Sequence, residues 1–426
     1  MKYRPRVADK LLENKLKGMG AVLVEGAKWC GKTTTSEQHA KSVLYMDSPK
    51  DRTTNIQMAQ INPELLLAGE TPRLIDEWQI APELWDTVRF TVDHREEDGQ
   101  FILTGSVTPL SDEDEEKIYH SGAGRIARLK MRPMTLWESG DSNGQISMAA
   151  LFHSPDKMYG TCDKSLLDIA WLICRGGWPR AVNQDKEIAL GRAFDYYDSV
   201  VNVDIKEPDG VERNPERVKL LMRSYARNQG TQVSLGAICA DMKANDNDTL
   251  DDRTVYSYLK ALKGIFVVED VKAWNPNLRS KAAIRTSDTR YFTDPSIAVA
   301  ALGVGPADLM TDLNTMGLLF ETMCMCDLRV YAQALDGDVY HYRDSDGLEC
   351  DAVVHLRNGA YGLIEIKLGG ESLTEEGAKS LAKLAKKIDT TKMKSPAFLM
   401  VLTATGKYAF KREDGVWVVP IGTLKD

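Results

Sequence analysis

The feature that most constrains the fold of this chain is the segment from Gly26 to Thr33, which reads GAKWCGKT and fits the pattern GxxxxGK[ST]. The preceding run, 21–25 (AVLVE), is apolar and β-branched and predicts a buried strand. A polar run that predicts a helix follows at 33–42 (TTTSEQHAKS). A strand, a glycine-containing turn and a helix in this order are typical of a phosphate-binding loop in a parallel α/β sheet.

The residue types in this segment suit a nucleotide. Glycines allow backbone N–H groups to wrap around phosphates without a Cβ clash. The Lys32 ammonium is expected at the β- and γ-phosphates, and the Thr33 hydroxyl at Mg²⁺. The segment therefore predicts a site for ATP and Mg²⁺, formed by Gly26, Ala27, Lys28, Trp29, Cys30, Gly31, Lys32, Thr33 and Thr34.

Two further apolar runs end in polar residues. The run 73–77 (RLIDE) ends in Asp76 and Glu77, which would hold the Mg²⁺ shell and act as catalytic base, respectively. The run 101–104 (FILT) leads to Ser106, whose hydroxyl would contact the γ-phosphate or the attacking water. A strand end that merely turns into a loop is the alternative for Ser106.

The order of predicted elements indicates the fold class. Strands alternate with helical patterns such as 81–94, which predicts a parallel sheet with helices on both faces. Mostly helical sequence follows, and then three amphipathic patterns and a β-rich run at 265–273 suggest a winged helix. The acidic stretch 111–117 predicts a solvated loop or a helix start. The predicted division is a P-loop domain at 1–145, a helical linker or lid at 146–210, a winged helix at 211–275 and a restriction-endonuclease-like α/β domain at 276–426.

A candidate metal site lies in the C-terminal part. Glu365 and Lys367 share one face of a predicted strand, and Asp351 lies on the preceding strand, across an Asn-Gly hairpin. This spacing fits the PD-(D/E)XK nuclease pattern, in which Asp351 and Glu365 would hold Mg²⁺ and Lys367 would position the water. Glu321 would complete the metal shell. The alternative is a solvated sheet face with cross-strand ion pairs.

Basic residues on the winged-helix candidate include Arg253, Lys260 and Lys263, a placement that suits contact with the DNA backbone. Acidic residues such as Asp251 and Asp252 crowd the neighbouring turn, so a packing module between domains is equally compatible with the pattern.

Composition narrows the class of protein. The net charge of −8 argues against a protein coated in phosphate-binding charge, although a local basic groove remains compatible with it. Seven scattered cysteines, without a CxxC pair, predict reduced thiols. We expect a cytoplasmic protein that does not enter a membrane, because the sequence contains neither a signal-like N-terminus nor an apolar run of about 18 residues.

Together, the motifs VEGAKWCGKTTT, LIDEWQ, FILTGS, GAGR and RPMTLWE resemble those of prokaryotic AAA-type ATPases with a C-terminal nuclease-like domain of unknown function. The later motifs RGGWP, YFTDPSIA, LLFETM and LIEIKLG are similar to the same family. The resemblance implies that Ser106 is a sensor residue and that Arg125 is a catalytic arginine finger acting on a neighbour's nucleotide. It therefore implies a homo-oligomer, either a ring or at least a dimer.

Two functions follow as hypotheses. In the first, ATP hydrolysis drives the binding, remodelling or cleavage of DNA. In the second, the chain is a nucleotide-dependent signalling or scaffold switch that binds a protein partner, and its nuclease-like domain does not cleave.

Overall fold

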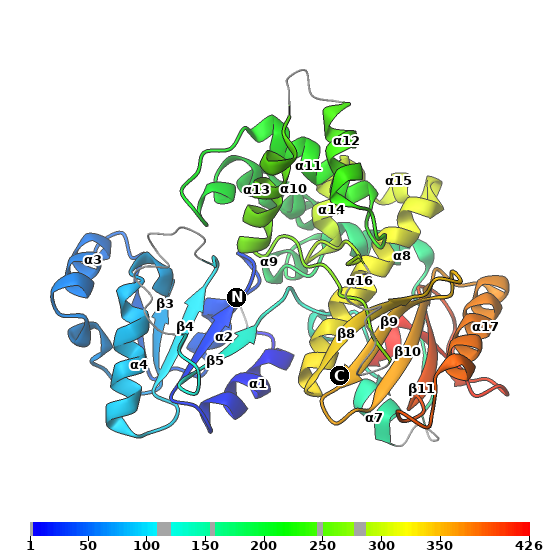
Figure 1. The fold of residues 1–426 in the computed structure, drawn as a ribbon, viewed down its shortest axis with the longest axis horizontal. Helices are drawn as coiled ribbons and strands as arrows, with labels where there is room; N and C mark the ends of the chain where they lie inside the picture. The colour runs from blue at the N-terminus through cyan, green and yellow to red at the C-terminus, as the bar shows by residue number, and fades with distance from the viewer. Residues whose placement is uncertain (1–2, 109–120, 154–157, 245–249, 277–286) are drawn as a thin grey trace. The chain divides into compact units, whose positions relative to one another are not determined.

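The computed structural model describes residues 3–108, 121–153, 158–244, 250–276 and 287–426. The acidic stretch 111–117 lies outside the described residues. The chain divides into two compact units (Figure 1). The first unit contains residues 1–133, 202–213 and 257–267, and the second contains residues 134–201, 214–256 and 268–426. The predicted division into four domains is not tested by this result and stays a prediction.

The first unit is built on a five-stranded parallel sheet with the order β2-β3-β4-β1-β5. Alternate side chains of each strand enter two separate cores, one on each face of the sheet. In β1, for example, Leu23 joins the core under α4 and Val24 joins the core under α1. The elements are α1 (Val7–Leu16), β1 (Ala21–Glu25), α2 (Lys32–Glu37), β2 (Ser42–Tyr45), α3 (Arg52–Ile61), β3 (Arg73–Asp76), α4 (Glu83–Arg95), β4 (Phe101–Gly105) and β5 (Ile126–Lys130).

The second unit contains a seven-stranded mixed sheet with the order β7-β12-β13-β11-β10-β9-β8. Helix α17 packs on it over an apolar core. The Asp346-Gly347 and Asn358-Gly359 turns join β8 to β9 and β9 to β10, as predicted. The elements of this part are α16 (Leu313–Ala334), β8 (Gly337–Arg343), β9 (Glu349–Leu356), β10 (Tyr361–Lys367), α17 (Glu371–Lys387), β11 (Phe398–Thr403), β12 (Tyr408–Lys411), β13 (Trp417–Pro420) and β14 (Leu424–Lys425).

The middle of the chain is mostly helical, but it also gives two short strands to the C-terminal part. Strand β6 pairs with β14, and β7 pairs with β12. The elements are α6 (Leu136–Ser139), β6 (Ile146–Ser147), α7 (Met148–His153), β7 (Gly160–Thr161), α8 (Leu166–Arg175), α9 (Pro179–Val182), α10 (Lys186–Asn202), α11 (Pro215–Arg227), α12 (Leu235–Lys243), α13 (Asp252–Gly264), α14 (Pro295–Leu302) and α15 (Pro306–Thr311).

Helices α11, α12 and α13 confirm the three predicted amphipathic patterns. The β-rich run that follows forms isolated bridges, in which Val268 pairs with Phe292 and Val271 with Thr289. The α/β class, with an N-terminal parallel sheet, a helical middle and a C-terminal sheet, is confirmed. The winged-helix assignment stays a prediction.

Two motifs far apart in the sequence meet inside the second unit. The Gly177 N–H donates to Asp294 Oδ2 over 2.8 Å, and Trp178 Nε1 donates to Ser296 Oγ over 2.9 Å. A Cβ at Gly177 would lie 2.2 Å from the Met134 carbonyl oxygen, so the close approach requires glycine. The RGGWP and TDPSIA motifs therefore have a packing role here.

Candidate functional site

The phosphate-loop segment joins β1 to α2, as its sequence predicts. Gly31 has φ +101°, in the region that favours glycine. Gly26 approaches the residue after β5 so closely that a Cβ would lie 2.0 Å from the Met131 carbonyl oxygen. Trp29 has φ +66° and is half-exposed, whereas Cys30 is buried. The loop therefore has the tight, backbone-lined curvature that a phosphate cradle needs.

The side chain of Lys32 turns back into this curve. Its Nζ donates to the carbonyl oxygens of Gly26 (2.9 Å) and Ala27 (3.0 Å), and the residue is buried. Thr34, by contrast, is exposed at the start of α2. The Lys32 ammonium is thus held inside the loop, where it would meet the β- and γ-phosphates.

A buried arginine that the sequence reasoning missed supports the loop from outside. Arg6 precedes α1, and its guanidinium donates to the carbonyl oxygens of Cys30 (2.9 Å) and Arg132 (2.7 Å). It therefore ties the loop to the segment that follows β5. No local sequence signal identifies this role, because Arg6 lies 24 residues before its loop partner.

Asp76 lies at the end of β3, beside the loop. Its Oδ1 accepts hydrogen bonds from the hydroxyls of Thr33 (2.8 Å) and Thr104 (2.5 Å). Burial raises the pKa of Asp76, and the two hydroxyls oppose that rise only in part. The structure thus brings together Thr33 and Asp76, the two residues expected to hold Mg²⁺.

Glu77 adopts a left-handed backbone conformation, with φ +56°. Its N–H donates to Thr104 Oγ1 over 3.1 Å, so Thr104 fixes both acidic residues. The Glu77 carboxylate accepts hydrogen bonds from Ser106 Oγ (2.9 Å) and from Gln79 Nε2. The structure therefore places Ser106 beside the expected base. The contribution of Gln79 was not predicted, although its position two residues after Glu77 is a usable signal.

Oxygen donors, a lysine and a backbone curve of this kind fit Mg²⁺ and a polyphosphate. Thr33 and Asp76 would hold the ion, and Lys32 and the loop N–H groups would hold the phosphates. The bound ion would neutralise phosphate charge. Glu77, whose carboxylate accepts the hydrogen bond from Ser106, would accept a proton from water in such a site.

Arg125 lies at the opposite edge of the sheet from the phosphate loop. It directly precedes β5, whose first residue, Ile126, pairs with Ala21 at the start of β1, whereas the loop follows the end of β1. Its Nε donates to Asp93 Oδ1 over 2.6 Å. Arg125 therefore does not serve the nucleotide site of its own chain. Its role on a neighbour's nucleotide stays a prediction.

The second predicted cluster forms where the start of β9 lies beside the end of β10, away from the turn that joins them. Lys367 Nζ lies 2.7 Å from Glu365 Oε2 and 3.7 Å from Asp351 Oδ2. Asp351 Oδ2 also accepts the Ile366 N–H over 2.7 Å, and Ser380 Oγ donates to Glu365 Oε1 over 3.2 Å. The two carboxylates and the lysine therefore converge as their spacing predicts.

Glu321 lies near this cluster, but its carboxylate is surrounded by other residues, among them Tyr291 and Gly230. The hydroxyl of Tyr291 donates to Glu321 Oε1 over 2.5 Å, and a Cβ at Gly230 would lie 2.9 Å from the same oxygen. Burial and the charge of Asp351 raise the pKa of Glu321 well above its ordinary value. Over the described residues, no group of three or more His, Cys, Asp or Glu side chains is arranged to hold a metal ion. The metal assignment to Glu321, Asp351 and Glu365 stays a prediction.

The titration of Glu365 has a measurable consequence. Burial, followed by the charge of Asp351, raises its pKa from 4.5 to about 7. A carboxyl whose pKa is higher in the folded than in the unfolded chain stabilises the fold while protonated, and this contribution falls as the pH rises from about 4.5 through about 7. We expect Glu365→Gln to lose less thermal stability than the wild type over this range, measured as Tm against pH. Parallel Tm curves for the two proteins would contradict the raised pKa, and Glu376→Gln, on the exposed side of α17, is the matched control.

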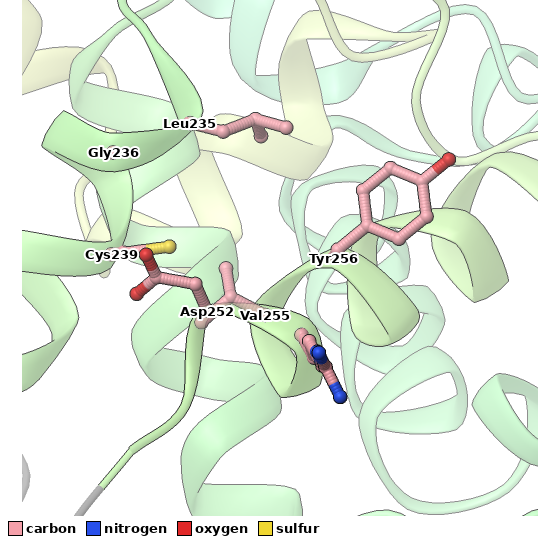
Figure 2. A pocket seen from close by; sticks show the side chains of 7 residues that line it. Leu235, Gly236, Cys239, Asp252, Val255 and Tyr256 are labelled. Carbon is pink, nitrogen blue, oxygen red and sulfur yellow. The ribbon is translucent and has the colours of Figure 1, made fainter.

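A separate, mainly apolar pocket of about 340 Å³ lies between α12 and α13 (Figure 2). Tyr256 stands at one side of it and Cys239 at the other, close to Asp252. The lining residues are Leu235, Gly236, Cys239, Asp252, Arg253, Val255 and Tyr256. Sequence reasoning did not identify this pocket.

None of the helices in the described ranges has the length and apolar character that a membrane crossing requires.

Three family models match successive parts of the chain. Residues 19–139 match an AAA domain, residues 167–308 match a domain of unknown function (DUF8612) and residues 316–424 match a second domain of unknown function (DUF4143). The first match covers β1, the phosphate loop, and β3 and β4 with the residues Asp76, Glu77 and Ser106 at or just after their ends. The N-terminal parallel sheet and its phosphate loop are therefore similar to the AAA type of P-loop domain.

Similar whole proteins include uncharacterized proteins of Mycobacterium bovis and Mycobacterium tuberculosis. Each is 24% identical over 372 residues, which cover 85% of this chain and 73% of the relative. Among solved structures, a Walker-type ATPase of Pyrococcus abyssi is similar with a TM-score of 0.42 and 15% identity, over 70% of this chain and 99% of that chain. RuvB of Thermotoga maritima is similar with a TM-score of 0.28 and 15% identity, over 61% of this chain and 87% of that chain.

Proposed function

We propose that this protein hydrolyses ATP with Mg²⁺. The observation that carries the proposal is the hydrogen-bonded set in which Thr33 and Thr104 hold Asp76 while Ser106 holds Glu77. Binding alone needs the loop, whereas an oriented carboxylate next to a metal-ligand pair is what hydrolysis needs.

In this proposal each group has a defined task. Lys32 and the loop N–H groups bind and orient the phosphates. Thr33 and Asp76 hold Mg²⁺. Glu77 orients water and accepts its proton, and Ser106 keeps the carboxylate in place. Most of the rate acceleration would come from positioning and electrostatic stabilisation, as in phosphoryl transfer generally.

We further propose that hydrolysis is coupled to DNA. Exposed Arg253, Lys260 and Lys263 support this proposal, because they lie on one face of α13 at a spacing that suits contact with a phosphate backbone. Cleavage of that DNA by Asp351, Glu365 and Lys367 is the further hypothesis. The competing hypothesis is a nucleotide-dependent switch that binds a protein partner.

A comparison of rates tests both proposals. We expect phosphate release from ATP that requires Mg²⁺, stops with a chelator and rises several-fold when duplex or branched DNA is added at low salt. If DNA does not change the rate of ATP hydrolysis and causes no gel shift at low salt, the result would favour the nucleotide-dependent switch that binds a protein partner. The absence of phosphate release under every condition would overturn the proposed hydrolysis.

A further inference from the structure

An acidic pair contacts the phosphate loop from a distant part of the chain. Lys28 Nζ lies 2.9 Å from Asp204 Oδ1 and 2.5 Å from Glu207 Oε1. The Asp204 side chain is 5% exposed, and those of Lys28 and Glu207 are each 31% exposed, so solvent screens these ion pairs only in part. The third residue of the loop is therefore held by two carboxylates.

The segment that carries these acids has an unusual place in the chain. Residues 202–213 pack with the first unit, although the chain on both sides of them belongs to the second unit. A movement of this segment would therefore affect both of its chain connections to the second unit. The Lys28 ion pairs join the nucleotide loop directly to this stretch of chain.

Hydrogen bonds within residues 202–213 also hold this segment together. Arg213 donates two parallel hydrogen bonds to the Asp209 carboxylate, at 2.8 and 2.6 Å, and a third to the Ile205 carbonyl oxygen at 3.1 Å. Its Nη2 also lies 3.3 Å from Ser257 Oγ on α13. Because a bidentate arginine pair fixes geometry, a change at Asp204 would move the segment as a whole.

ATP would compete with this acidic pair for Lys28. Glu207 lies close enough to the catalytic carboxylate for the charge of Glu77 to add to the rise in the Glu207 pKa, which is caused first by burial. Glu207 thus lies near the expected catalytic base. Phosphate groups arriving there would attract the Lys28 ammonium and repel both carboxylates.

We propose that Lys28, Asp204 and Glu207 form a nucleotide sensor. Without nucleotide, Lys28 holds residues 202–213 on the phosphate loop. When ATP binds, the ammonium transfers to the phosphates and the segment is released, so that its two connections carry the nucleotide state to the second unit. This inference rests on the proposed binding of ATP, and the test separates the two.

The test is hydrogen–deuterium exchange of the full chain with Mg²⁺ and a non-hydrolysable ATP analogue, together with the affinity for that analogue. In the wild type, exchange in residues 202–213 should rise when the analogue binds. In Asp204→Asn/Glu207→Gln, exchange should already be high without nucleotide, and the analogue should bind roughly fivefold more tightly because no competing ion pair must break.

Variants of the other residues complete the design. Lys28→Met should also show high exchange without nucleotide, but the analogue should bind roughly tenfold more weakly. Lys206→Gln is the matched control, because Lys206 lies in the same segment and pairs with Glu212 instead. It should behave as the wild type. The single variant Glu207→Gln, at a less buried position, replaces the double variant if the latter does not fold.

Two outcomes would overturn the sensor. If the analogue binds the wild type while exchange in residues 202–213 stays constant or falls, the sensor is wrong and ATP binding stands. If the analogue does not bind the wild type at all, the proposed function fails and the sensor fails with it.

Discussion

Lys32→Ala is expected to abolish ATP turnover and to reduce nucleotide binding by at least about a hundredfold. The reason is the position of the ammonium, which is buried and held inside the phosphate loop by the carbonyl oxygens of Gly26 and Ala27. Alanine removes the positive charge closest to the expected β- and γ-phosphates and leaves the loop carbonyls facing them. Equilibrium binding of a fluorescent ATP analogue and phosphate release measure the two effects.

The control for this variant is Lys17→Ala. Lys17 is exposed and pairs with Glu13 on the surface of α1, so its loss removes the same charge without touching the loop. Equal Tm values for the two variants would show that the effect of Lys32→Ala is not a loss of fold. Wild-type turnover in Lys32→Ala would mean that phosphates bind elsewhere, and the assignment of the loop would be wrong.

The parts of this site that sequence could predict are those encoded by short spacings. The loop pattern, the strand before it and the acidic strand end each occupy fewer than ten residues, so local patterns suffice. Parallel strands then bring their carboxyl ends to one edge of the sheet. That rule predicts the contact between Thr33 and Asp76, which the structure shows at 2.8 Å.

The parts that sequence could not predict depend on contacts between distant residues. Arg6 supports the loop across 24 residues, and Asp204 reaches Lys28 across 176. Neither side chain belongs to a pattern, because an isolated arginine or aspartate on a helical segment most often faces solvent. Strand β5 also lacked a clear signal, since Arg128 interrupts its apolar run at the edge of the sheet.

The C-terminal cluster shows the same division. The Asn-Gly turn fixed the pairing of β9 with β10, and the alternation along β10 put Glu365 and Lys367 on one face. The enclosure of Glu321 by Tyr291 and Gly230 follows from the packing of segments 30 and 91 residues away in sequence, which no periodicity encodes.

Glu77→Gln is expected to separate binding from hydrolysis. The amide keeps the size of the side chain and can still accept the hydrogen bond that Ser106 donates, which is 2.9 Å long in the wild type. Affinity for ATP should therefore stay within a few-fold of the wild type. Hydrolysis should fall by roughly a hundred- to ten-thousandfold, because the amide cannot accept a proton from water. Analogue binding and single-turnover phosphate release measure the two quantities.

The matched control for this variant is Glu64→Gln, at an exposed position of the same unit, which should leave both quantities unchanged. If Glu77→Gln hydrolyses ATP at the wild-type rate, another group must act as the base. Asp76 is poorly suited to it, because its Oδ1 already accepts hydrogen bonds from the hydroxyls of Thr33 and Thr104. A joint loss of binding and hydrolysis would instead mean that Glu77 maintains the shape of the loop. This alternative must be excluded because Glu77 has a left-handed backbone conformation, with φ +56°.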